Sequence, residues 1–197
     1  MSTAFTEFAK ELHSWYWKYP QSDYFKGSLH IEGRLGSKAR DRGHLELDDL
    51  VEIANWGGRQ HGIHKRVQRE NTCAEVRTRT AKAVDRLDDP AAALESLLEI
   101  REWGLTYASK TLRFMCPSNY GALDSVIREA IDPKLLPRIY DGHTSSMVNG
   151  YERFLALCIQ LRTQIKERGP REGGVWFVAD IEMALFQFVS EGGMLRR

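Results

Sequence analysis

One carboxylate, Asp124, follows two short predicted helices that a tight turn connects. The first helix is expected at residues 91–100 and the second at 106–115, with the turn running through Glu102, Trp103 and Gly104. Backbone N–H groups at the start of the second helix lack partners inside it, so they can hold a phosphate. Asp124 would then lie near the sugar of the held strand. A carboxylate in that place can stabilise positive charge on the sugar, or orient and deprotonate a water molecule.

Two structural interpretations of Asp124 stay open beside the chemical one. The residue precedes a predicted helix at 125–131, where an aspartate commonly serves as a plain N-cap. It could equally pair with Arg128, one helical turn further along.

The segment from Ser96 to Ala130 resembles the helix-hairpin-helix DNA glycosylases, which are base-excision enzymes with an essential aspartate after the hairpin. Asp124 follows Ala108 by 16 positions, which suits the interval in that family. The residues that carry the resemblance are Gly104, Ala108, Ser109, Lys110, Leu112, Phe114, Pro117, Asp124, Ser125 and Arg128.

The resemblance implies an all-α, two-lobed fold with a DNA cleft between the lobes. One lobe would comprise roughly residues 1–45 and 133–197, and the other residues 46–132 with the hairpin at 96–115. Asp124 would be catalytic. The DNA-binding residues would be Trp103, Gly104, Thr106, Ser109, Lys110 and Arg113, and the pocket for a flipped base would include Asn55, Trp56, Arg59, Gln60 and His61.

Two positions depart from the pattern of that family. Glu102 occupies a place where the hairpin usually has glycine. Thr106 occupies the place where lyase-active members have the lysine that forms a Schiff base. The resemblance therefore implies a monofunctional enzyme, which leaves an abasic site without cutting the strand.

Composition limits the remaining possibilities. A chain of 197 residues with 42% hydrophobic and 28% charged residues is typical of a globular protein, and its net charge of +1 indicates no partner by itself. The cysteines at 73, 116 and 158 are too scattered for a disulfide framework, a zinc site or the iron–sulfur cluster of some glycosylases. His61 and His64 lie three apart but lack an evident third ligand. We expect a cytoplasmic protein without metal, cofactor, membrane span or obligatory protein partner.

Periodicity and capping signals predict the other elements. Helices are expected at 4–19, 46–56, 72–87, 151–166 and 181–189, with Asp180 as the N-cap of the last one. Residues 20–44 are rich in glycine and basic side chains and are predicted to form a connector, and residues 142–150 a polar loop. Asp180 and Glu182 could alternatively form a pair of carboxylates with a chemical role.

Together these features favour a monofunctional DNA glycosylase that binds double-stranded DNA, flips a base and hydrolyses its N-glycosidic bond. Two substrate groups stay open. Oxidised, deaminated or alkylated bases would indicate DNA repair, whereas bulky modified pyrimidines of phage DNA would indicate antiviral defence. The alternatives from other classes are a non-catalytic helix-hairpin-helix DNA-binding protein and a helical interaction protein.

Overall fold

The computed structural model describes residues 3–22, 25, 27–58 and 62–195. These residues form helices and loops, with one isolated β-bridge between Ile131 and Leu195, so the predicted all-α class is confirmed for this part of the chain. The helices are α1 (Thr3–Lys18), η1 (Tyr19–Gln21), α2 (Ser28–Arg42), α3 (Leu47–Trp56), α4 (Ile63–Glu70), α5 (Cys73–Val84), α6 (Pro90–Leu98), α7 (Leu105–Met115), α8 (Ser125–Ala130), α9 (Thr144–Arg162), η3 (Glu172–Gly174) and α10 (Val178–Ser190).

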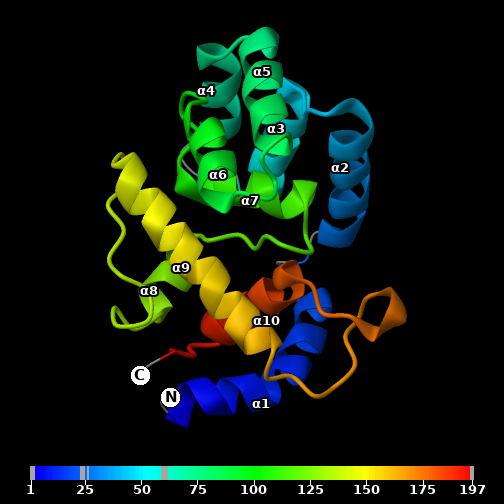
Figure 1. Ribbon diagram of the computed structural model, residues 1–197, viewed down its shortest axis with the longest axis vertical. Helices are drawn as coiled ribbons and strands as arrows, with labels where there is room; N and C mark the ends of the chain where they lie inside the picture. The colour runs from blue at the N-terminus through cyan, green and yellow to red at the C-terminus, as the bar shows by residue number, and fades with distance from the viewer. Residues whose placement is uncertain (1–2, 23–24, 26, 59–61, 196–197) are drawn as a thin grey trace.

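The helices pack in two groups, which Figure 1 shows above and below one another. In the upper group α2 packs on α7, α3 on α4, and α5 on α6, while in the lower group α1, α8 and α9 all pack on α10. Helix α9 also contacts α6 and so joins the groups. Helix α2 packs on the hairpin helix α7, and α8 packs on α10.

Helix α2 is the largest error of the sequence prediction, which placed a connector at 20–44. The buried side chains Ile31, Leu35 and Ala39 recur every four residues and form one apolar face. Gly36 belongs to the same face, and a Cβ atom there would come within 3.3 Å of the carbonyl oxygen of Phe114. The glycine that suggested a loop therefore permits close packing of α2 on α7.

The two C-terminal helices also begin earlier than predicted. Helix α9 starts at Thr144, so most of the expected loop at 142–150 is helical. Helix α10 starts at Val178, which makes Asp180 a residue of its first turn rather than its N-cap. The Asp180 carboxylate accepts a hydrogen bond from the backbone N–H of Phe177 at 2.9 Å. It therefore still pairs a backbone N–H group at the N-terminus of the helix.

The helix caps that the sequence predicts before α5 and α6 are present in the structure. The Thr72 hydroxyl accepts from the N–H of Glu75 at 3.2 Å, and the Glu75 carboxylate accepts from the N–H of Thr72 at 2.7 Å. Asp89 caps α6 by accepting from the N–H of Ala92 at 3.1 Å. These interactions span three residues, which is why they could be predicted without knowledge of the fold.

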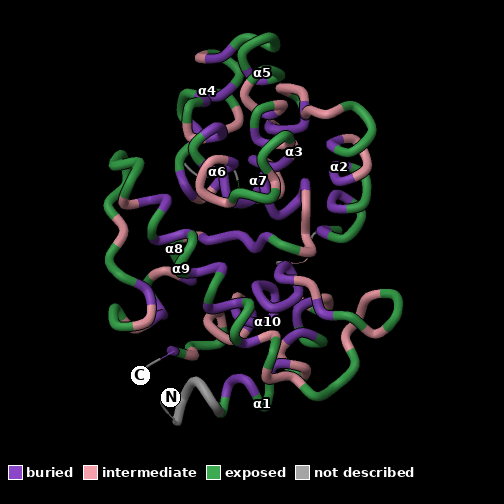
Figure 2. The backbone as a smooth tube through the Cα atoms, viewed as in Figure 1, coloured by how far each residue is buried: buried purple, intermediate pink, exposed green. Residues whose placement is uncertain are grey.

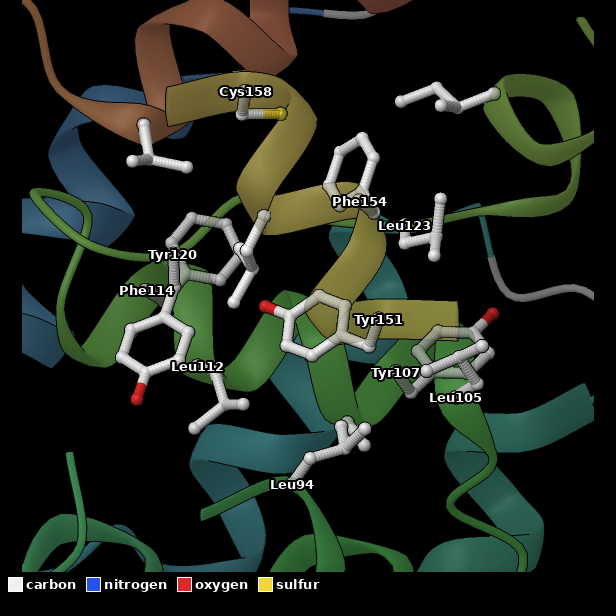
Figure 3. Close-up of a cluster of buried hydrophobic side chains, with 14 of the residues drawn as sticks. Leu94, Leu105, Tyr107, Leu112, Phe114, Tyr120, Leu123, Tyr151, Phe154 and Cys158 are labelled. Atoms are coloured by element: carbon white, nitrogen blue, oxygen red, sulfur yellow. The ribbon is translucent and has the colours of Figure 1, made fainter. Parts of the chain in front are cut away.

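The segment between α7 and α8 runs between the two groups and is buried from Tyr120 to Leu123 (Figure 2). Tyr120 and Leu123 lie in an apolar cluster with Phe114 of α7 and with Tyr151 and Phe154 of α9 (Figure 3). Because α9 contacts both groups, this cluster fixes the segment relative to both.

The hairpin turn contains a strained residue. Glu102 has a φ of 65°, and it is the position where the resemblance predicts glycine. A side chain in the left-handed region costs roughly 1–2 kcal/mol, since Cβ crowds the following carbonyl. Glu102 thus adopts a backbone conformation that glycine would adopt without this cost.

We expect Glu102→Gly to stabilise the fold. The side chain forms an ion pair with Arg66 at 3.0 Å that is more than a third exposed on both sides, so its loss costs little. Glu102→Gln removes the same charge but keeps the strain. In urea unfolding, the glycine variant should exceed the glutamine variant in stability by about 1 kcal/mol. Equal stabilities would mean that the turn is not strained.

Candidate functional site

Asp124 stands at the junction of the buried segment and α8. Its Oδ1 atom accepts from the backbone N–H of Ile127 at 3.1 Å, so the N-cap interpretation is confirmed. No hydrogen bond of its Oδ2 atom is seen within the described part of the chain, and the side chain is partly exposed. Arg128 instead pairs with Asp141 at 2.8 Å. Capping therefore occupies one carboxylate oxygen and leaves the other available.

Three hydrogen bonds hold the residues that precede Asp124. The Ser109 hydroxyl accepts from the N–H of Leu123 at 2.9 Å. The Tyr151 hydroxyl donates to the carbonyl of Gly121 at 2.9 Å, and the Tyr120 hydroxyl donates to the carbonyl of Leu87 at 2.9 Å. The position of Asp124 relative to the hairpin is set by these buried contacts.

A cavity of about 240 Å³ opens beside Asp124. Its lining combines η1, the end of α3, the first half of α7, the start of α8 and α10. The polar and aromatic side chains that matter for chemistry are Tyr19, Trp56, Thr106, Lys110, Asp124 and Glu182. Four of these, Trp56, Thr106, Lys110 and Asp124, are among the site residues predicted from the sequence.

Aromatic and cationic groups form one wall of this cavity. The Trp56 ring packs edge-on against Phe114, with ring centroids 5.0 Å apart. Its indole N–H donates to the carbonyl of Phe25 at 3.4 Å. The ammonium group of Lys110 lies 5.3 Å from the Trp56 centroid and 5.4 Å from that of Tyr107. Burial raises the pKa of the Tyr19 phenol, so this residue contributes a neutral hydroxyl.

Glu182 is the second carboxyl group of the cavity. Its side chain is only 5% exposed, and burial raises its pKa to about 7. The Arg113 guanidinium opposes the increase, whereas the negative charge of Asp124 adds to it. Gly121 permits this placement, because a Cβ atom there would lie 2.9 Å from the Cβ atom of Glu182.

Glu182 belongs to a buried chain of charges that continues away from the cavity. Its Oε2 atom accepts from Nε of Arg113 at 3.2 Å, and Nη2 of Arg113 lies 3.5 Å from Oε2 of Glu32. Glu32 also accepts from Arg171 at 2.6 Å, and Arg171 pairs with Asp180 at 2.7 Å. The network links α2, α7, α10 and the segment before α10.

Three of the side chains predicted to contact DNA are buried. Arg113 is fully buried between carboxylates, because its helix face points into the protein. The Trp103 ring is 1% exposed, and its N–H donates to the Thr111 hydroxyl at 3.1 Å. Ser109 is fully buried where its hydroxyl accepts from Leu123. The Lys110 residue is 6% exposed and lines the cavity rather than the outer surface.

The predicted base-reading segment is described only in part. Asn55 lies beside Trp56 but does not line the cavity, and its Oδ1 atom is buried without a hydrogen-bond partner among the described residues. Arg59, Gln60 and His61 lie outside the described residues. No group of three His, Cys, Asp or Glu side chains suited to a metal ion occurs among the residues that are described.

From the sequence, Glu182 was considered only as one half of a possible carboxylate pair with Asp180, and Tyr19 was not assigned to the site. The available signal for Glu182 was its place inside the apolar run from Ile181 to Leu185, because a carboxylate is seldom buried in such a run unless it is paired. Tyr19 follows α1 directly and is 3% exposed, and no local pattern distinguishes it from a core tyrosine.

A second cavity, of about 540 Å³, lies at the hairpin turn. Gly104, the exposed N-cap of α7, lines it together with Arg128. Thr106 lines both cavities. The first turn of α7 thus lies between the cavity at the hairpin turn and the cavity that holds the two carboxyl groups.

Comparison with protein-family models, with curated proteins and with solved structures finds no match. The site must therefore be interpreted from its own geometry. Within the part of the chain that the structure describes, no helix has the length and apolar character of a membrane span.

Arg113 should be a structural residue with a large effect on stability. Arg113→Met keeps an unbranched apolar stem but leaves Glu182 and Glu32 buried without the guanidinium, which should cost about 3 kcal/mol or more. Arg69 provides a control, since its side chain is 73% exposed and pairs with its neighbour Glu70. Chemical denaturation should show almost no effect of Arg69→Met. A similarly small effect of Arg113→Met would contradict the assigned role of the buried network.

Proposed function

We propose that this chain is a monofunctional DNA glycosylase that hydrolyses the N-glycosidic bond of a flipped base. In this proposal the two helix groups act as the lobes of a glycosylase-type fold, with duplex DNA bound between them. Asp124 acts on the sugar, and the protein works in the cytoplasm, where its three free cysteines stay reduced.

The observation that supports the proposal is that residues predicted for separate roles line one cavity, the one of about 240 Å³. Asp124 was singled out from the sequence for its spacing after the hairpin, and Lys110 as a residue of the hairpin itself. Both line this cavity with Trp56. Cleavage of an N-glycosidic bond leaves a sugar with oxocarbenium character, which a carboxylate stabilises. An extruded base needs an aromatic or apolar wall, which Trp56, Tyr19 and Phe186 provide.

The hairpin supplies a means of holding the DNA backbone. Because Trp103 and Arg113 are buried, the grip would come from the backbone N–H groups at the start of α7, beside the exposed Gly104. Such contacts position a strand without reading its sequence. In this proposal the base is recognised in the cavity, and the hairpin binds only the DNA backbone.

The substrate groups considered above both remain candidates for the cavity. A panel of duplexes that contain oxoguanine, uracil, methyladenine or glucosylated hydroxymethylcytosine covers repair and defence. Incubation followed by alkaline cleavage reveals abasic sites. Release confined to the glucosylated duplex supports defence, and release confined to the other three supports repair. Salt-dependent binding without release of any base would instead indicate a non-catalytic DNA-binding protein.

Asp124→Asn should abolish most of the activity while the fold survives. Asparagine caps a helix about as well as aspartate does, so the bond to Ile127 can persist. Loss of the negative charge should slow base release roughly a hundredfold or more in single-turnover assays. Asp88→Asn makes the same change at an exposed position between α5 and α6 and should have no effect. Full activity of a folded Asp124→Asn protein would remove Asp124 from the mechanism.

The enzyme should stop at the abasic site. A threonine hydroxyl at position 106 cannot form a Schiff base, and Lys110 is held over Trp56 and Tyr107. Borohydride added during reaction should therefore trap no covalent protein–DNA adduct. An adduct that forms with the wild type and disappears in Lys110→Ala would make Lys110 the nucleophile and the enzyme bifunctional.

A further inference from the structure

The cavity contains two carboxyl groups with different surroundings. Asp124 caps α8 and is partly exposed, whereas Glu182 projects from α10, is almost fully buried and faces Arg113. Two carboxyl groups whose environments differ in this way commonly divide the roles of base and acid in one site.

We propose that Glu182 is the general acid of this site and donates a proton to the departing base. This inference rests on the proposed glycosylase function and adds to it a second catalytic residue with a defined role.

Burial favours a proton on the Glu182 carboxyl group near neutral pH, although the nearby cations oppose it. The groups that face it come from every element packed around it. The direct neighbours are Arg113 and Lys110 on α7, Asp124 before α8, Tyr19 on η1, and Tyr151 and Cys158 on α9. Arg113 in turn connects Glu182 to Glu32 of α2, and Glu32 pairs with Arg171, which pairs with Asp180. Burial dominates over these charges and raises the pKa of Glu182 to about 7.

The proton balance of the reaction can be written completely. The bond between C1′ and the base nitrogen breaks, and its electron pair stays with the base. The base takes a proton from Glu182, which becomes a carboxylate, while Asp124 stabilises the positive sugar. Water then adds to C1′, and the proton that it loses returns to Glu182. The products are a free base and an abasic site, with no oxidant or co-reactant required.

Arg113 suits the charged form that appears during this step. Its Nε atom already donates to Glu182 at 3.2 Å, so the carboxylate would form beside a fixed positive charge. A preorganised partner of this kind lowers the cost of ionising a buried acid. Arg113 is therefore a positioning residue in the proposed mechanism, distinct from the two carboxyl groups.

The decisive experiment compares neutral and cationic bases. A neutral base leaves as an anion unless it gains a proton, whereas 7-methylguanine already carries a positive charge and needs no acid. Glu182→Gln should slow release of a neutral base about a hundredfold and leave release of 7-methylguanine within about a factor of three. Equal losses on both substrates would show that Glu182 matters for structure alone and would overturn the proposal.

The pH profile gives a second readout. An acid works only while it is protonated, so single-turnover release of a neutral base should fall as pH rises through about 7. Glu182→Gln should lack this decrease. A wild-type rate that is unchanged across this range, or a variant that retains the decrease, contradicts the proposal. If the wild type does not act on 7-methylguanine, this profile decides.

Folding and ionisation are checked without activity. Glutamine keeps an oxygen that can accept from Arg113. If this variant does not fold, the pH profile and the carboxyl titration of the wild type test the proposal. Titration of ¹³C-labelled glutamate carboxyls by NMR should show a midpoint near pH 7 that Glu182→Gln removes. A midpoint below about 5 would overturn the proposal.

The two proposals fail in different ways. If the wild type releases no base from any DNA, the glycosylase function is lost and the role of Glu182 falls with it. If it releases base but Glu182→Gln behaves like the wild type, only the role of Glu182 is lost.

Discussion

The buried guanidinium of Arg113 is the group on which the arrangement of the helices depends most. It lies on α7 and meets Glu182 of α10 and Glu32 of α2, while Arg171 joins Glu32 to Asp180. Burying these charges costs several kcal/mol per ion, and the cost is recovered only when every partner is in place. The network therefore contributes little net stability but strongly disfavours any packing in which α2, α7 and α10 are displaced. It also fixes the face of α10 that reaches the cavity.

Sequence patterns identified the elements whose signals are local. The Thr72–Glu75 capping box, the Asp89 cap and the amphipathic helices involve residues three or four positions apart, so no tertiary contact was needed to predict them. Helix α2 was missed because Gly36 looks like a helix breaker until it is seen against Phe114. A close approach between helices has no signature in either segment alone.

The same distinction between local signals and tertiary contacts applies to the candidate site. Asp124, Lys110 and Trp56 were predicted for three separate roles, and all three line the same cavity. Arg113 was assigned to DNA because the resemblance places it on the second helix of the hairpin. Its carboxylate partner Glu182 lies 69 positions away, so the residues near Arg113 in the sequence do not indicate this pairing. The charged residues of a segment therefore predict a role only when the residues that they pair with are known.

The location of Thr106 connects the two halves of the proposed function. Its side chain lines both the hairpin cavity and the cavity with the carboxyl groups, so the first turn of α7 is their common wall. Gly104 lines the cavity on one side of this wall, and Asp124 lines the cavity on the other. The buried segment from Tyr120 to Leu123 prevents Asp124 from moving away from that position. Since a carboxylate stabilises a developing charge only when it is already in place, this rigidity would contribute directly to catalysis.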